Sequence, residues 1–197
     1  DYENGITNPE KLNDFELGWR HESDRLRLNA NVYYMQYNNQ LVLSGALDNV
    51  GEYIRENVDK SYRLGLELDA SIILTEQLSL VSNFALSKNK IQDLTINRDG
   101  AVRNLNDTNI AFSPDLITTH ALEYAPNTKF RAALIGKYVG EQYLSNTDTE
   151  ASKLDSYFVT DFNFTYTLPV NNVFDSIVFT GMVNNLFDLE YVDRGFT

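Results

Sequence analysis

The feature that most constrains this sequence is a two-residue alternation of apolar and polar side chains between Lys60 and Ile91. Every second residue from Tyr62 to Ile72 is apolar, and the residues between them are small or charged. The alternation resumes at Leu78 after a turn. This period predicts β-strands with one apolar and one wet face. Both strands are longer than the five or six residues usual in globular sheets, and they match the roughly 9–11 that cross a bilayer at a tilt. We therefore predict a transmembrane β-hairpin here.

The same alternation continues along the chain and predicts about eight antiparallel strands without a helical segment. Short turns are predicted at 21–24, 73–77, 125–128 and 169–176. Long connections are predicted at 38–59, 92–113 and 140–156. Alternating short and long connections are typical of outer-membrane barrels, which have short periplasmic turns and long extracellular loops.

The pattern also predicts which side chains share a face. We expect one apolar, lipid-directed set: Leu64, Leu66, Leu68, Phe130, Leu134, Phe162 and Phe164. We expect a wet set on the opposite face: Arg63, Glu67, Asp69, Arg131 and Asn163. A register slip of one residue would exchange the two faces.

Aromatic residues of the apolar face gather at the predicted strand ends. Next to short turns are Trp19, Tyr124, Phe130 and Tyr166; next to long connections are Tyr34, Tyr62, Tyr138 and Phe158. Two such rows match the aromatic girdles of membrane barrels. The alternative is that aromatic residues simply favour strands, and the clustering at strand ends favours girdles.

Composition narrows the functional classes. The formal net charge of −12 argues against nucleic acid as a partner. The absence of cysteine argues against a disulfide scaffold or a thiolate metal site. No apolar run approaches the roughly 18 residues of a membrane helix. The first residues do not form a secretory signal, so an exported protein would begin before this sequence.

Four motifs, taken in order, resemble the C-terminal half of TonB-dependent outer-membrane receptors. Residues 185–191 read N-L-F-D-L-E-Y, which is similar to the family's N-L-F-D-x-x-Y signature. Residues 9–18 resemble its P-E…E-x-G strand, and residues 62–67 resemble its G-x-E strand. The pair 113–114 resembles the proline that opens a later strand.

The resemblance implies a 22-stranded barrel around an N-terminal plug in the bacterial outer membrane, which imports a scarce nutrient with energy from the TonB complex. Iron–siderophore complexes are the default cargo of such a receptor, and no cofactor is expected. We expect residues 1–197 to be a single region of that barrel, with the plug domain and the last strand outside it. The sheet should then be curved and open, with its first and last strands not paired to each other. The expected partners are outer-membrane lipid, the plug, the remaining strands, the TonB complex and a small-molecule chelate.

No catalytic or metal-binding group is predicted, and a non-enzymatic role is expected. His120 lies on the apolar face, where an outer-membrane phospholipase would need a Ser–His pair, but Ser113 is too far along the strand. The acids Asp93, Asp99 and Asp107 share a loop without the spacing of an EF-hand, so solvated acids are the favoured interpretation.

Two further sets of residues are candidates for contacts. The wet-face residues Arg63, Glu67, Asp69, Arg131 and Lys137 are expected to form cross-strand ion pairs or contacts with a plug. Because function concentrates on loops held by a rigid scaffold, the long loops are where substrate would bind. The aromatic and cationic candidates for an anionic chelate are Tyr53, Arg55, Arg98, Arg103 and Tyr143.

Two alternative functions stay open at this point. One is a small self-contained outer-membrane barrel with a structural or adhesive role, whose last strand would close on its first. The other is a soluble ligand-binding barrel or sandwich, in which the Leu/Phe face would form a core.

Overall fold

The structure is a computed structural model that describes residues 7–47, 49–98, 101–170 and 175–195. Its main element is a nine-stranded antiparallel sheet in the order β1-β2-β3-β4-β8-β9-β12-β13, with β7 paired to β4. The strands are β1 (Lys11–Glu22), β2 (Leu26–Leu47), β3 (Tyr53–Ile73), β4 (Leu78–Ile91), β7 (Thr108–Asn109), β8 (Leu116–Asn127), β9 (Phe130–Val139), β12 (Tyr157–Pro169) and β13 (Ser176–Val183). The predicted all-β antiparallel class is confirmed.

The long connections carry small elements of their own. They hold the pair β5 (Thr95–Arg98) and β6 (Ala101–Asn104), the pair β10 (Gln142–Tyr143) and β11 (Lys153–Leu154), and the 3-10 turn η1 (Glu150–Ser152). The described residues contain no helix long and apolar enough to cross a membrane.

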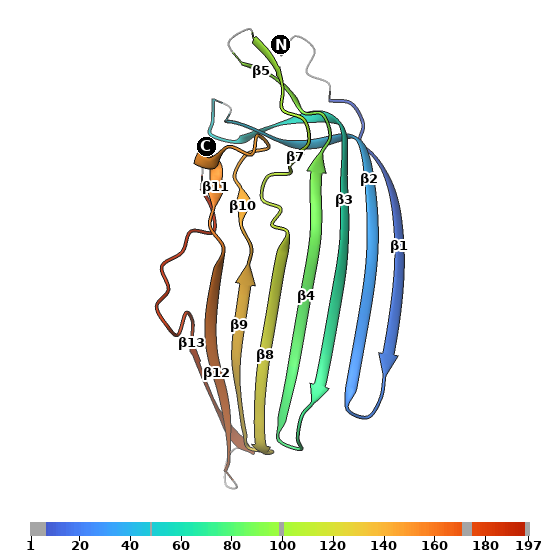
Figure 1. Cartoon of the computed structure of the whole chain (residues 1–197). Coiled ribbons are helices and arrows are strands. Elements are labelled where there is room, and N and C mark those ends of the chain that lie inside the picture. The colour runs from blue at the N-terminus through green and yellow to red at the C-terminus, as the bar shows by residue number, and fades with distance from the viewer. Residues whose placement is uncertain (1–6, 48, 99–100, 171–174, 196–197) are drawn as a thin grey trace.

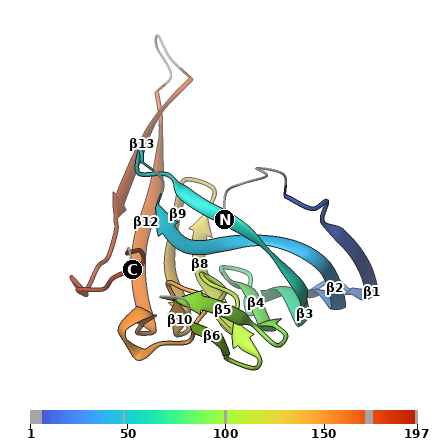
Figure 2. The same cartoon turned by 90° about the horizontal axis from the view of Figure 1, so that it is seen from above.

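The sheet is an open arc, as predicted. Figure 2 shows it from above, with β1 and β13 at the two ends of the curve. Among the described residues β1 pairs only with β2, and β13 pairs only with β12. Among the described residues, the short turns lie at one end of the sheet and the long connections at the other (Figure 1).

The backbone register confirms the predicted faces. Leu66 of β3 lies opposite Val32 and Leu86. Leu134 of β9 lies opposite Leu122 and Phe162. Because directly opposite residues of antiparallel strands share a face, the apolar set continues across the whole sheet. The predicted wet residues occupy the other face.

Because the strands are tilted, residues paired across successive strands from β1 to β12 lie progressively closer to the long-loop side of the membrane. One row runs from Trp19 through Ala30, Leu68, Phe84, Thr118 and Tyr138 to Phe158. Trp19 is beside a short turn, whereas Tyr138 and Phe158 are beside long connections. With about 4.8 Å per strand and a tilt near 40°, this row rises roughly 19 Å. The eight residue steps from Tyr138 down to Phe130 span roughly 20 Å along the membrane normal with the same tilt. The two aromatic rows therefore fit one tilted membrane barrel.

The prediction of a long connection over residues 38–59 is wrong. β2 and β3 remain paired up to Leu47 and Tyr53, and they form a hairpin extension beyond the rest of the sheet. The chain bends at Asn39, whose φ of 56° is a left-handed conformation that Asn tolerates. Figure 2 shows the extension crossing from the side of β3 towards that of β13. Backbone pairing continues beyond the membrane, where the apolar face that marks a spanning strand is no longer needed.

The buried apolar cluster lies at the long-loop end. It contains Val42, Val58, Ile91, Leu94 and Ile110. These residues come from the extension, from the end of β4 and from the connection that follows β4. The cluster therefore holds the extension against the loops, while the apolar face of the sheet itself remains available for lipid.

Two glycines are covered by aromatic rings from a neighbouring strand. The Tyr33 ring lies across its cross-strand partner Gly65. A Cβ atom at Gly136 would lie 2.6 Å from Cζ of Phe158. A side chain at either position would displace a ring, so the sheet needs glycine there for close approach.

Candidate functional site at the long-loop end

All five predicted substrate-binding residues belong to the long-loop end, but they lie on separate elements. Arg55 is exposed in the β2–β3 extension, Arg103 is exposed in β6, and Tyr143 is half-buried in β10. Tyr53 begins β3 and Arg98 ends β5, and the side chains of both are outside the described part of the structure. No hydrogen bond or ring contact joins Arg55, Arg103 and Tyr143 within the described residues. They remain a prediction rather than an assembled site.

Asn146 connects three segments of this end, although no sequence pattern marks it as a functional residue. Its Oδ1 accepts a hydrogen bond of 2.8 Å from the backbone N–H of Ala111. Its Nδ2 donates one of 2.5 Å to the carbonyl of Leu43. The side chain is 6% exposed. The connection 140–156 is thereby tied both to the connection 92–115 and to the extension.

Asp148 makes a second tie between the same connections. One carboxylate oxygen accepts the backbone N–H of Asn109 at 2.9 Å, and the other accepts Nδ2 of Asn109 at 3.0 Å. Nearby, the hydroxyl of buried Ser152 accepts hydrogen bonds from Ser145 at 3.1 Å and Thr149 at 3.0 Å. These polar groups fix the loop rather than offering free ligands.

The local charge of the connection 140–156 is acidic. Lys153 lies 3.4 Å from Glu150 and 3.5 Å from Glu141. The hydrogen bond to Glu150 and the charges of both acids raise the pKa of Lys153. The positive charge of this lysine is therefore already paired with two acids, and Asp155 adds a further negative charge. The described groups of this loop do not favour an anionic ligand.

A cavity of about 490 Å³ lies between residues 153–158 and 189–192. Tyr157 and Tyr191 stack beside it with ring centroids 4.3 Å apart. Asn185, in the N-L-F-D motif, holds the adjoining turn: its Oδ1 accepts the Leu189 N–H at 2.9 Å, and its own N–H donates to Asp161 Oδ1 at 2.7 Å. The motif thus positions one wall of the cavity.

Of the two expected roles of the wet-face residues, cross-strand ion pairs are wrong for the described residues, and contacts with a plug stay a prediction. Arg63 donates to Asn89 at 3.0 Å and to Ser113 at 3.2 Å, and Asp69 accepts a hydrogen bond from Asn83. Within the described residues none of Arg63, Glu67, Asp69, Arg131 and Lys137 forms an ion pair. Neutral partners replace ion pairs at two of these residues: Arg63 bonds to an amide and a hydroxyl, and Asp69 bonds to an amide.

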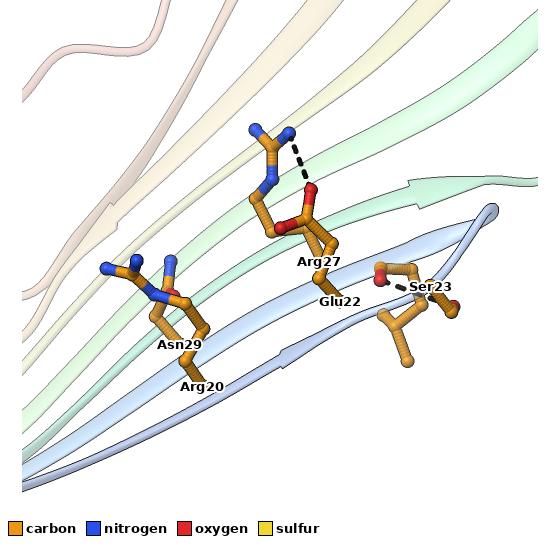
Figure 3. Close-up of polar contacts among 6 residues, drawn as sticks. Arg20, Glu22, Ser23, Arg27 and Asn29 are labelled. Atoms are coloured by element: carbon orange, nitrogen blue, oxygen red, sulfur yellow. Dashed lines mark hydrogen bonds and ion pairs between the residues drawn. The ribbon is translucent and has the colours of Figure 1, made fainter.

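The wet face of the first hairpin is polar down to the short turn. Arg20 Nε donates to Asn29 Oδ1 at 2.9 Å, and Arg27 lies 3.3 Å from Glu22. Figure 3 shows these four side chains projecting to the same side of the hairpin. This side is suited to water or to a polar partner inside a barrel.

Ser82 is a partner of His120 that the sequence analysis overlooked. The two lie directly opposite each other on the apolar face, and Ser82 Oγ is 2.7 Å from His120 Nδ1. The flanking residues on that face are Ala70, Phe84 and Gly136, which offer no carboxylate to orient the imidazole. The pair satisfies two polar groups on a lipid-directed surface. The spacing along the chain gave no signal, because register alone joins these two residues.

The described residues contain no group of three or more His, Cys, Asp or Glu side chains that could hold a metal ion. The described part of the long-loop end offers a polar, acidic surface held by internal hydrogen bonds, and a cavity beside Tyr157 and Tyr191.

Comparison with known proteins identifies the sheet. The family model described as "TonB dependent receptor-like, beta-barrel" matches residues 1–186. No curated protein matches the sequence.

Solved structures match with low identity. The siderophore receptor PiuA from Acinetobacter baumannii is 20% identical, with a TM-score of 0.72 over 100% of this chain and 27% of that one. The ferric yersiniabactin uptake receptor FyuA from Yersinia pestis is 18% identical, with a TM-score of 0.71 over 95% of this chain and 26% of that one. The copper transporter OprC is 21% identical, with a TM-score of 0.69 over 94% of this chain and 26% of that one. The chain thus spans about a quarter of the length of the receptors it matches.

Proposed function

Because this chain belongs to the TonB-dependent receptor-like β-barrel family, we propose that it forms part of a receptor that takes up an iron–siderophore complex. Family membership makes the chain part of a non-enzymatic transporter of the bacterial outer membrane. The identity of the cargo is the proposed part. The proposal also includes the partners: a plug domain, the remaining strands of a larger barrel and the TonB complex.

The observation that carries the transport proposal is the unbroken register of two chemically different faces. An apolar face bounded by two aromatic rows fits lipid, and a wet face rich in amides and arginines fits a barrel interior. A plug inside the barrel would meet charged side chains that the sheet leaves without ion pairs, among them Arg131 and Lys137. The open edges of β1 and β13 would pair with the remaining strands, because unpaired backbone groups are costly in hydrocarbon.

The proposal of an iron–siderophore cargo is supported by the kind of receptor that the sheet resembles. PiuA is a siderophore receptor and FyuA is a ferric yersiniabactin uptake receptor, whereas OprC is a copper transporter. The acidic connection 140–156 favours a neutral or cationic chelate over the anionic one considered from the sequence.

The test is uptake by the full-length receptor in cells that lack other siderophore receptors. Radiolabelled ferric complexes of a neutral hydroxamate and of an anionic catecholate would be compared, with a copper salt in a third arm. We expect energy-dependent iron uptake that a protonophore abolishes, with the neutral complex preferred. Copper uptake without iron uptake would contradict the cargo, and uptake that is independent of energy would contradict the mechanism.

The candidate residues can be tested in the same assay. Replacing Arg103 with Gln or Tyr143 with Ala should raise the half-saturating concentration of the chelate severalfold if these residues contact it. Arg27→Gln, at the short-turn end, is the matched control. Equal effects from Arg103 and Arg27 would remove the loop residue from the proposed site.

A further inference from the structure

Four lysines gather on the lipid-directed face at the long-loop end, and we refer to Lys11, Lys60, Lys88 and Lys90 as the outer lysine cluster. Lys11 and Lys60 share one row through Asn38. Lys90 lies opposite Tyr62, and Lys88 lies opposite Leu64. Since opposite residues share a face, all four lysines belong to the apolar face and not to the wet one.

The cluster lies at the height of lipid headgroups. With the spacing and tilt used for the aromatic rows, the four lysines are roughly 19–26 Å above Trp19, and the upper aromatic row is roughly 13–21 Å above it. The backbone positions of the lysines are therefore level with the top of the upper aromatic row (Tyr34, Tyr62, Tyr138 and Phe158) or above it. Headgroups of the leaflet on the long-loop side occupy this level.

The charges of the cluster are not compensated by the described residues. None of the four lysines forms an ion pair within the described ranges; Lys11, Lys60 and Lys88 are exposed, and Lys90 is half-buried. In the spanning part of the described strands, the apolar face carries no acid. At the short-turn end of these strands the same face carries no lysine or arginine. If these lysines only extended their charged ends from the hydrocarbon to the nearest interface, cations would be expected at both membrane interfaces. The presence of lysines at the long-loop interface alone therefore needs another cause.

We propose that the outer lysine cluster binds the phosphate groups of an anionic lipid headgroup in the leaflet on the long-loop side. Lys88 and Lys90 are about 7 Å apart along one strand, and Lys60 is diagonal to Lys90 at about 7–8 Å. Lys11 is about 10 Å from Lys60 across two strands. This spread suits a headgroup with more than one phosphate. Beneath the cluster, Leu64 and Leu86 offer an apolar surface to the acyl chains.

The test uses the full-length receptor in mild detergent, with bound lipid measured by native mass spectrometry. The probe is lipid A with two phosphates, and dephosphorylated lipid A and inorganic phosphate form two further arms. Replacing all four lysines with Gln should weaken binding of the bisphosphorylated probe about tenfold or more, because each lysine near a charged surface contributes separately. The control replaces Lys137 on the wet face and Lys129 in the short turn between β8 and β9 with Gln, and it should bind as the wild type does.

Folding is checked by heat-modifiable migration on gels, and the double change Lys88→Gln with Lys90→Gln should give an intermediate loss if the fourfold variant folds poorly. Equal binding by wild type and cluster variants would overturn the proposal. An equal loss in the wet-face control would do the same. Displacement of the lipid by inorganic phosphate at equal concentration would show a free-phosphate site rather than a lipid site.

Discussion

Asn146 donates a hydrogen bond to the carbonyl of Leu43, which lies 103 residues earlier in the chain. Its other side-chain atom accepts the N–H of Ala111. One buried amide thus holds together the extension and two long connections.

Asn146→Ala should therefore loosen the long-loop end while leaving the membrane part folded. Leaving the Ala111 N–H and the Leu43 carbonyl without this partner should cost about 1–3 kcal/mol locally. Hydrogen exchange at Ala111 would measure the loss, with Ser156→Ala, an exposed position in the same connection, as the control. Unchanged protection of Ala111 would contradict the role assigned to Asn146.

Leu66→Arg should destabilise the barrel, whereas Glu67→Leu should have little effect. Leu66 faces lipid near the middle of the apolar band, where an arginine costs about 2–4 kcal/mol. Glu67 belongs to the wet face, and no described partner depends on its carboxylate. Urea titrations of the full-length receptor in lipid vesicles would compare the two variants. Equal penalties would mean that the faces are assigned incorrectly.

Gly136→Val should displace the Phe158 ring that covers this glycine. Crowding of this kind costs about 1–3 kcal/mol. The matched control is Gly18→Ala, because the atom nearest to a Cβ at Gly18 is 3.8 Å away. Thermal unfolding in detergent would record a lower midpoint for the Gly136 variant. A midpoint equal to that of the control would show that the ring can move aside freely.

The β2–β3 extension should be more stable in mild acid than at neutral pH. Desolvation raises the pKa of the Glu56 carboxyl above its ordinary value of 4.5. Ionisation is therefore harder in the folded extension than in the unfolded one. The penalty is present above the folded pKa, and it is lost as the pH falls through that value towards the unfolded pKa.

Hydrogen exchange at Val42, corrected for intrinsic rates, would follow this change between about pH 5 and 7.5. Glu56→Gln should remove most of the difference and raise protection at neutral pH. Protection that increases with pH in the wild type would reverse the sign and contradict the assignment.

The spanning strands were predictable from the sequence because lipid imposes a simple rule on them. Leu64, Leu66 and Leu68 must face hydrocarbon, so their alternation is visible without coordinates. The extension was not predictable in this way. Beyond Asn39 the strands no longer face lipid, and residues such as Val42 and Val58 turn towards a local core instead.

The contacts at the long-loop end could not be predicted from the sequence for a different reason. Asn146 and Asp148 resemble any solvated loop residues until the fold brings Leu43, Ala111 and Asn109 beside them. Ser82 and His120 likewise meet only through strand register. The family motifs could be recognised in the sequence, but the structural reason for their residues could not. For Gly65 that reason is the Tyr33 ring, which lies across it.

Strand order also constrains how such a sheet is assembled. Nearly every strand pairs with its immediate predecessor and successor among the spanning strands, so hairpins can add one after another with short loop closures. The hydrogen bond from Asn146 to Leu43, here called the latch, is an exception because the spanning strands β3, β4, β8 and β9 lie between the two residues. It can close only after the strands between these two residues have been laid down. Formation of the latch is therefore a late event in biogenesis, and its presence would indicate that strands β2 to β9 of the barrel have assembled.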